Sequence, residues 1–154
     1  GDISTESCDE DAPACIAAGQ TPAKSWIVMD LGQSLPDTWM DPWRFSGGLW
    51  RLKVEGMVEQ PKSVKLKTIE RLGVRKYTVD WNCVTGWRFA GLSLHGVPLR
   101  DFISDVCRPS DGWEFLYQVS ADGYTTVVSR EDAMAADAFV AIFDAQRQLL
   151  SKDH

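Results

Sequence analysis

The chain has few of the residues on which metal and phosphate sites usually depend. It contains only two histidines, His95 and His154, so histidine-based metal sites and general bases have little material to draw on. Its four cysteines lack the paired short spacings of a zinc site. Neither a Walker pattern nor Gly-x-Gly-x-x-Gly occurs, so the usual phosphate-binding loops are excluded. No apolar run approaches the roughly 20 residues of a membrane helix, and we expect no membrane span.

Positive charge is also in short supply. The net charge is −6 and the pI is near 4.8, which disfavours binding to nucleic acid or to anionic lipid. An anionic substrate would therefore need a local basic pocket. Arg88 and Arg100 are candidates for it, and we favour Arg88 as the catalytic one; the alternative for each is a solvated surface charge.

The sequence predicts one compact domain preceded by an arm. The 154 residues, 44% of them hydrophobic and 25% charged, suffice for a single globular domain. Residues 1–24 are polar, acidic and small, and we expect a flexible amino-terminal arm followed by a domain over residues 25–154. Cys8 and Cys15 in the arm close a small disulfide loop in an oxidising compartment or stay reduced. Because the chain begins with Gly rather than Met, it is read as a mature or an engineered form from which an export signal was removed, and we expect a periplasmic or otherwise exported protein.

Periodicity predicts an α+β fold of strand-rich mixed sheets with short helices. Alternating or β-branched runs predict strands at residues 26–29, 50–56, 63–66, 75–81, 113–119, 124–128 and 139–143. Short helices are expected at residues 67–72, 99–106 and 130–134. Ser129 is placed to cap the last of them.

One cysteine lies where a strand meets a turn. The run at 75–81 delivers Cys83 to the point where Thr85 and Gly86 turn the chain. Such a thiol is a small buried hydrophobe, a nucleophile or a soft-metal ligand. A nucleophile usually needs a histidine base, and the sequence places neither histidine beside Cys83.

A series of motifs around this cysteine resembles a known family. Leu-Lys-Val-Glu-Gly-Met-Val-Glu-Gln-Pro at 52–61, Asn-Cys-Val-Thr-Gly-Trp at 82–87 and Gly-Val-Pro-Leu-Arg-Asp at 96–101 occur in that order. Asp-Gly-Tyr-Thr-Thr follows at 122–126. Together they resemble the molybdopterin-binding domain of the sulfite oxidase family, and in particular its bacterial branch with the methionine sulfoxide reductase catalytic subunit.

The resemblance implies a cofactor and its ligands. Cys83 matches the cysteine whose thiolate binds molybdenum beside the dithiolene sulfurs of molybdopterin, and His154 matches a residue that contacts the pterin. The family pattern continues with Gly-x-Pro-Leu-Arg beyond the last residue here, so we expect a domain truncated at its C-terminal end. Val119 and Leu94 depart from the family pattern, which has Thr and Trp there.

The expected function follows from the same resemblance. It is a molybdenum-cofactor-dependent oxidoreductase that moves an oxygen atom to or from a small substrate, such as sulfite or a sulfoxide, and exchanges electrons with a haem partner. Cys83 and Arg88 are the expected catalytic residues. The alternative is a binding or structural module that keeps the family fold without the cofactor.

Overall fold

A computed structural model of the chain describes residues 20–27 and 50–151. It divides into two compact units. We call them the hairpin unit, Gly1–Ile27 with Thr78–Ser93, and the core unit, Val28–Tyr77 with Leu94–His154. The expected disulfide between Cys8 and Cys15 and the pterin contact of His154 lie outside the described residues.

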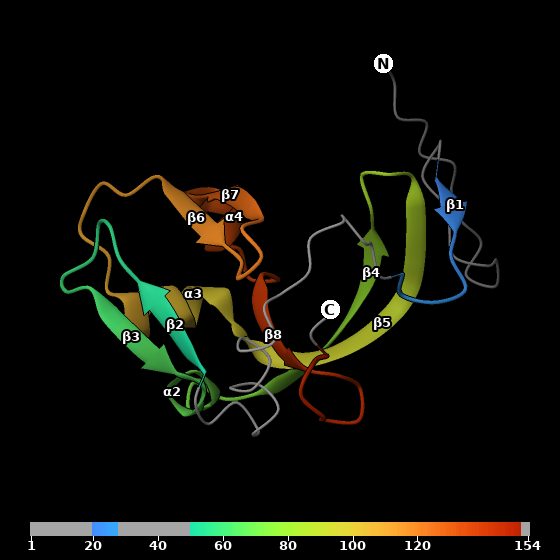
Figure 1. The fold of residues 1–154 in the computed structure, drawn as a ribbon, viewed down its shortest axis with the longest axis horizontal. Helices are drawn as coiled ribbons and strands as arrows, with labels where there is room; N and C mark the ends of the chain where they lie inside the picture. The colour runs from blue at the N-terminus through green and yellow to red at the C-terminus, as the bar shows by residue number, and fades with distance from the viewer. Residues whose placement is uncertain (1–19, 28–49, 152–154) are drawn as a thin grey trace, which may run out of the picture. The chain divides into compact units, whose positions relative to one another are not determined.

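Strands dominate the described residues, and the helices are short (Figure 1). The strands are β1 (Thr21–Pro22), β2 (Arg51–Val54), β3 (Lys62–Lys65), β4 (Arg75–Asn82), β5 (Trp87–Pro98), β6 (Phe115–Val119), β7 (Thr125–Ser129) and β8 (Phe139–Phe143). The helices are α2 (Leu66–Glu70), α3 (Leu99–Asp101), the π-helix η1 (Phe102–Cys107) and α4 (Arg130–Ala133). Parallel and antiparallel pairs both occur, so the predicted α+β class with mixed sheets is confirmed.

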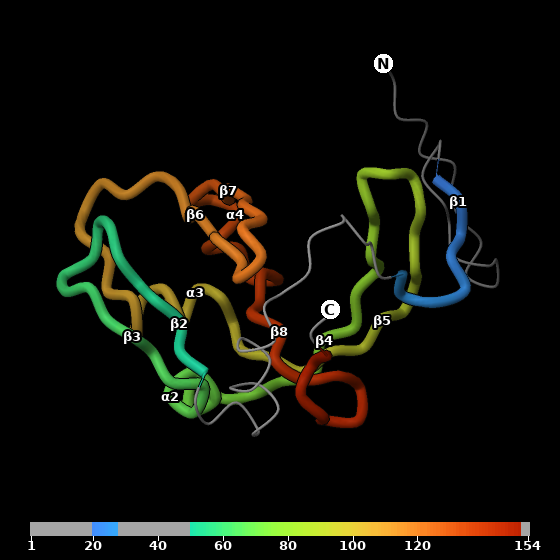
Figure 2. Tube along the Cα trace, in the orientation of Figure 1, coloured from blue at the N-terminus to red at the C-terminus, as the bar shows by residue number. Residues whose placement is uncertain are grey.

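The hairpin unit consists of the facing parts of β4 and β5 with β1 added at the edge (Figure 2). β1 runs parallel to β5, with Thr21 opposite Trp87. The Thr21 N–H donates to the Gly86 carbonyl at 2.7 Å, and the Ala23 N–H donates to the Arg88 carbonyl at 2.7 Å. The last residues of the expected arm are therefore tied to the hairpin by backbone hydrogen bonds.

The core unit contains the buried apolar side chains. It contains three antiparallel strand pairs: β2 with β3, β6 with β7, and β5 with β8. The first two pairs are separate two-stranded sheets. Its buried cluster consists of Val64, Leu66, Ile69, Val97, Leu99, Phe102, Ile103, Val106, Cys107, Trp113, Ala133 and Ile142. Tyr77 stacks on Phe139 with ring centroids 4.0 Å apart, which brings β4 and β8 together inside this unit.

Glycine at position 96 allows β5 and β8 to approach closely. A Cβ added at Gly96 would lie 1.9 Å from the Val140 carbonyl oxygen, a distance at which atoms overlap. The strand register shifts between His95 and Gly96. A side chain at this position would therefore separate the two strands.

Most predicted elements occur within a residue or two of the observed ones. The strand predicted at 75–81 is β4, the strand predicted at 139–143 is β8, and the Ser129 hydroxyl accepts from the Asp132 N–H at 3.2 Å as the cap of α4. The strand predicted at 113–119 begins only at Phe115. Trp113 is instead a buried core residue.

Two predictions need correction, and one strand was missed. Trp26 and Ile27 are not in a strand; the Trp26 ring instead packs against the Trp81 ring, with centroids 5.1 Å apart. The helix predicted at 99–106 is one turn of α-helix followed by the π-helix η1, and the residue that caps η1, Arg108, adopts the left-handed conformation with φ 48°. The strand β5 was not predicted at all. No helix in the described part of the chain is long and apolar enough to cross a membrane.

Candidate functional site

A tight turn at the end of the hairpin holds Cys83. The Cys83 N–H donates to the Trp87 carbonyl at 2.9 Å, and the Gly86 N–H donates back to the Cys83 carbonyl at 3.0 Å. Gly86 has φ 95°, the left-handed conformation that closes three-residue hairpin loops and that glycine adopts without strain. The cysteine therefore sits on a paired backbone with little freedom to move.

The local environment of the Cys83 sulfur favours the thiolate. The Thr85 hydroxyl lies 3.0 Å from Sγ, and this contact is the largest cause of a lowered Cys83 pKa. The backbone N–H groups of Thr85 and Val84 lower the pKa further. The side chain of Val84 is fully exposed. The thiolate is the form that binds metals and attacks electrophiles.

The other cysteine that the structure describes has the opposite character. Cys107 is buried in the core unit, and burial raises its pKa to about 11. A buried neutral thiol is a packing group rather than a ligand. Of these two cysteines, only Cys83 has the electrostatics of a functional one.

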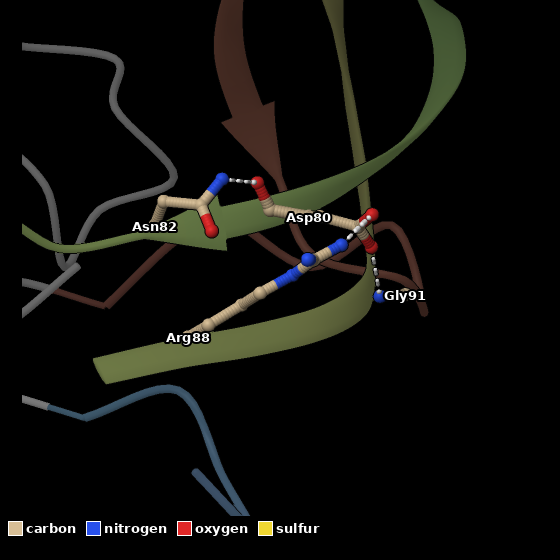
Figure 3. Close-up of polar contacts among 4 residues, drawn as sticks. All are labelled: Asp80, Asn82, Arg88 and Gly91. Carbon is tan, nitrogen blue, oxygen red and sulfur yellow. Dashed lines mark hydrogen bonds and ion pairs between the residues drawn. The ribbon is translucent and has the colours of Figure 1, made fainter. Parts of the chain in front are cut away.

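Arg88 lies one residue beyond the turn and is held by a carboxylate (Figure 3). Its Nη2 donates to Asp80 Oδ2 at 2.6 Å, and the Gly91 N–H donates to Asp80 Oδ1 at 3.0 Å. The Asn82 side-chain amide donates to the Asp80 backbone carbonyl at 3.4 Å. The Gly91 hydrogen bond and then the Arg88 guanidinium lower the Asp80 pKa. Both oxygens of this carboxylate thus have partners on β5.

The remaining predicted candidates lie elsewhere or carry no site geometry. Arg100 is an exposed residue of α3. His95 is buried, and its Nδ1 lies 2.8 Å from the Asp144 carbonyl oxygen, a hydrogen bond that anchors the loop after β8. Of the predicted site residues within the described part of the chain, Cys83 and Arg88 are the two that lie in the same hairpin.

Sequence reasoning missed two residues of this site. Thr85 was read only as part of a turn, and Asp80 only as the end of a strand. The signal for Thr85 is its position two residues after the cysteine, where a hydroxyl can reach back to the sulfur. Asp80 and Arg88 are eight residues apart, and only the register of the hairpin brings them together.

The donor set fits a molybdenum cofactor that brings most of its own ligands. No three His, Cys, Asp or Glu side chains within residues 20–27 and 50–151 gather into a site for a bare metal ion. Cys83 offers one soft thiolate on a fixed backbone, which suits a redox metal whose other sulfur ligands come from a pterin dithiolene.

Comparison with known proteins gives one match. No curated protein and no solved structure matches the chain. The family model described as oxidoreductase molybdopterin binding domain matches residues 41–154, which include the turn with Cys83 and most of the described residues. The chain therefore belongs to the family of oxidoreductase molybdopterin-binding domains, the sulfite oxidase family.

Proposed function

We propose that this chain, with the molybdenum cofactor bound, transfers an oxygen atom to or from a small substrate. The observation that carries the proposal is the Cys83 thiol, fixed at the end of a hairpin and biased toward the thiolate by Thr85, in a chain of this family. Sulfite and sulfoxides are the substrates we propose, with a haem protein as the electron partner. Export to the periplasm stays a prediction, which cell fractionation would test.

The chemistry divides between the cofactor and the chain. When bound, the cofactor supplies a metal that changes its oxidation state and exchanges an oxygen atom. In the oxidising direction the substrate gains one oxygen atom from water, and two electrons and two protons leave; reduction reverses this balance. Cys83 would supply the sulfur ligand, and the Thr85 hydroxyl, which lowers the pKa of that thiol, favours its thiolate form.

Arg88 is the proposed substrate-facing residue. It follows Trp87 at the start of β5, and Asp80 fixes its guanidinium from the neighbouring strand. A guanidinium held in one orientation binds a polar oxygen with little loss of side-chain entropy. His154 is proposed to contact the pterin, an assignment that rests on the family resemblance alone.

Cys83→Ser tests the proposal directly. The variant and the wild type are made in a host that synthesises the cofactor, and molybdenum and pterin are measured per folded chain. We expect metal content to fall more than about tenfold, because loss of a direct ligand exceeds the usual effect of a supporting residue. Circular dichroism should be unchanged, since the turn contributes nothing to the buried cluster.

Cys107→Ala is the matched control. It also removes a thiol, but from the core unit, where the pKa of Cys107 is raised to about 11. Its folded fraction should keep the wild-type metal content. Equal metal in wild type and Cys83→Ser would overturn the assignment, and a folded wild-type chain without any metal would favour a cofactor-free binding module.

A further inference from the structure

The strand pair of β6 and β7, which we call the ribbon, carries apolar side chains on both of its faces (Figure 1). Leu116 and Val128 lie opposite each other in the register and pack against the buried cluster of the core unit. Their neighbours along each strand point to the other face, because side chains alternate in a strand. That outer face carries Phe115, Tyr117, Val119, Thr125, Val127 and Ser129.

The outer face of the ribbon is apolar and open to solvent. Its large side chains are between 57% and 64% exposed: Phe115, Tyr117, Val119 and Val127. Tyr117 lies directly opposite Val127, and an aromatic side chain packs well against a β-branched one across a strand pair. Consecutive apolar residues, such as Phe-Leu-Tyr at the start of β6, are typical of strands buried on both faces. The composition of the ribbon therefore indicates a second layer against its outer face.

The charge of this face selects the kind of layer that fits it. Neither β6 nor β7 contains a charged residue, although the whole chain has a net charge of −6. Two copies of the chain that meet through this face bring no like charges into contact, whereas other surfaces of the chain repel each other. A twofold axis brings the same surface of both copies together, so a neutral apolar face is complementary to itself.

The size of the face fits a weak dimer. From the area that aromatic and valine side chains bury, its four large side chains expose roughly 400–500 Å² on each copy. Two such faces would bury roughly 900 Å² in total, below the roughly 1,200–2,000 Å² of stable complexes. We therefore expect a reversible association with a Kd of about 10–100 μM.

We propose that the outer face of the ribbon is a homodimer interface, covered by the same face of a second copy of this chain. The two ribbons pack face to face about 10 Å apart, as stacked sheets do. Tyr117 and Val127, the middle pair of the register, lie at the centre of the interface. The proposal does not depend on the cofactor or on the proposed function, because no ribbon residue belongs to the candidate site.

Sedimentation equilibrium of the full chain, over about 1–300 μM, measures the association. The buffer contains a reductant, so that no disulfide joins two copies. We expect the mass to rise from one chain to two and to stop there, because a twofold interface leaves no free face. Sulfate salts should strengthen the association, since they strengthen apolar burial. Sodium chloride should not weaken it, as it would weaken an interface of ion pairs.

Two substitutions place a charge in the face. Tyr117→Lys and Val127→Lys should each raise the Kd at least about tenfold, because each position is central and occurs twice in the dimer. Tyr117→Phe keeps the ring and should keep the dimer. Met57→Lys is the matched control, since Met57 is 54% exposed in the core unit outside the ribbon. It makes the same change of net charge and should keep the wild-type Kd.

Circular dichroism should be unchanged in these variants, because all of the substituted side chains are exposed. A chain that stays monomeric over the whole concentration range would overturn the proposal and leave the face to another segment of the chain or to a different protein. Association that both lysine variants of the ribbon leave unchanged, or that continues beyond two chains, would overturn it as well.

Discussion

The two described cysteines show how the same residue type takes opposite roles in one chain. Cys83 has hydrogen-bond donors around its sulfur, which stabilise negative charge, whereas Cys107 is surrounded by apolar groups that penalise it. The identity of the residue carries none of this difference. It comes from a hydroxyl two residues along the chain in one case and from burial in the other.

The first residue-scale prediction concerns alkylation. With cofactor absent, iodoacetamide should modify Cys83 faster than Cys107 near neutral pH, because more of its sulfur is thiolate and the loop is accessible. Thr85→Val should slow the Cys83 reaction, since loss of the hydroxyl raises the pKa. Peptide mass spectrometry over a pH series measures both. Faster labelling of Cys107 in the native chain would contradict the prediction.

The second residue-scale prediction concerns acid. The pKa of Asp80 is lowered in the folded chain from 3.8, so its ionised form stabilises the fold above that pH, and this contribution is lost as the pH falls through the folded value. Because the pair is partly exposed, we expect Asp80→Asn to cost under about 1 kcal/mol at neutral pH.

Urea unfolding at several pH values checks this. The free-energy difference between wild type and Asp80→Asn should be full near pH 7 and shrink below the ordinary carboxyl range. Thr78→Val, which changes no charge, should show a difference independent of pH. A gap that widens in acid would refute the assignment of the lowered pKa.

At the scale of the elements, local signals located most strands, and long-range pairing determined the ones that were missed. β4, β8 and the Ser129 cap follow from side chains within a few residues of each other. β5 was missed because Gly91 and Gly96 interrupt its apolar pattern and because its burial changes from half-exposed to fully buried along its length. Gly96 allows the backbone of β8 to approach closely, and the Gly91 N–H binds the Asp80 carboxylate on β4; a single-strand pattern reveals neither contact.

The element-scale prediction follows from the β5–β8 contact. Gly96→Ala should destabilise the chain by roughly 3 kcal/mol or more, because its Cβ would overlap the Val140 carbonyl and the strands must separate. The matched control is Gly123→Ala, where a Cβ meets nothing within 4 Å but φ is +88°. That control should cost only about 1–2 kcal/mol of backbone strain.

Denaturant unfolding of both variants measures the two free-energy changes. A Gly96→Ala cost no larger than the Gly123→Ala cost would mean that β5 and β8 are not packed as closely as the structure has them.

At the scale of the whole molecule, the buried apolar cluster and the candidate site residues belong to different units. Every residue of the buried cluster belongs to the core unit. In the hairpin unit, none of the residues 20–27 and 78–93 is buried, yet Cys83 and Arg88 lie there. The sequence predicted Cys83 from the family motifs and Arg88 as a candidate for a local basic pocket, but it did not predict that their surroundings would be supplied by hydrogen bonds of the hairpin rather than by a core.

Hydrogen exchange should reveal this division. Amides of β8 and of β5 at residues 94–97 should exchange slowly, because opening them exposes the buried cluster. Amides of the turn around Cys83 and of β1 should exchange much faster. Mass spectrometry of exchanged peptides resolves the two classes, and uniform protection across both would contradict it.

The π-helix η1 bears on how this chain tolerates insertions and deletions. A π-helix pairs each residue with one five positions away, where an α-helix pairs residues four apart, so removing one residue from Phe102–Cys107 restores ordinary helical pairing. Ser104 and Asp105 are the exposed members of this segment. Sequences of related domains that are one residue shorter here should therefore align with a single gap at Ser104 or Asp105 and an unbroken helix in place of η1.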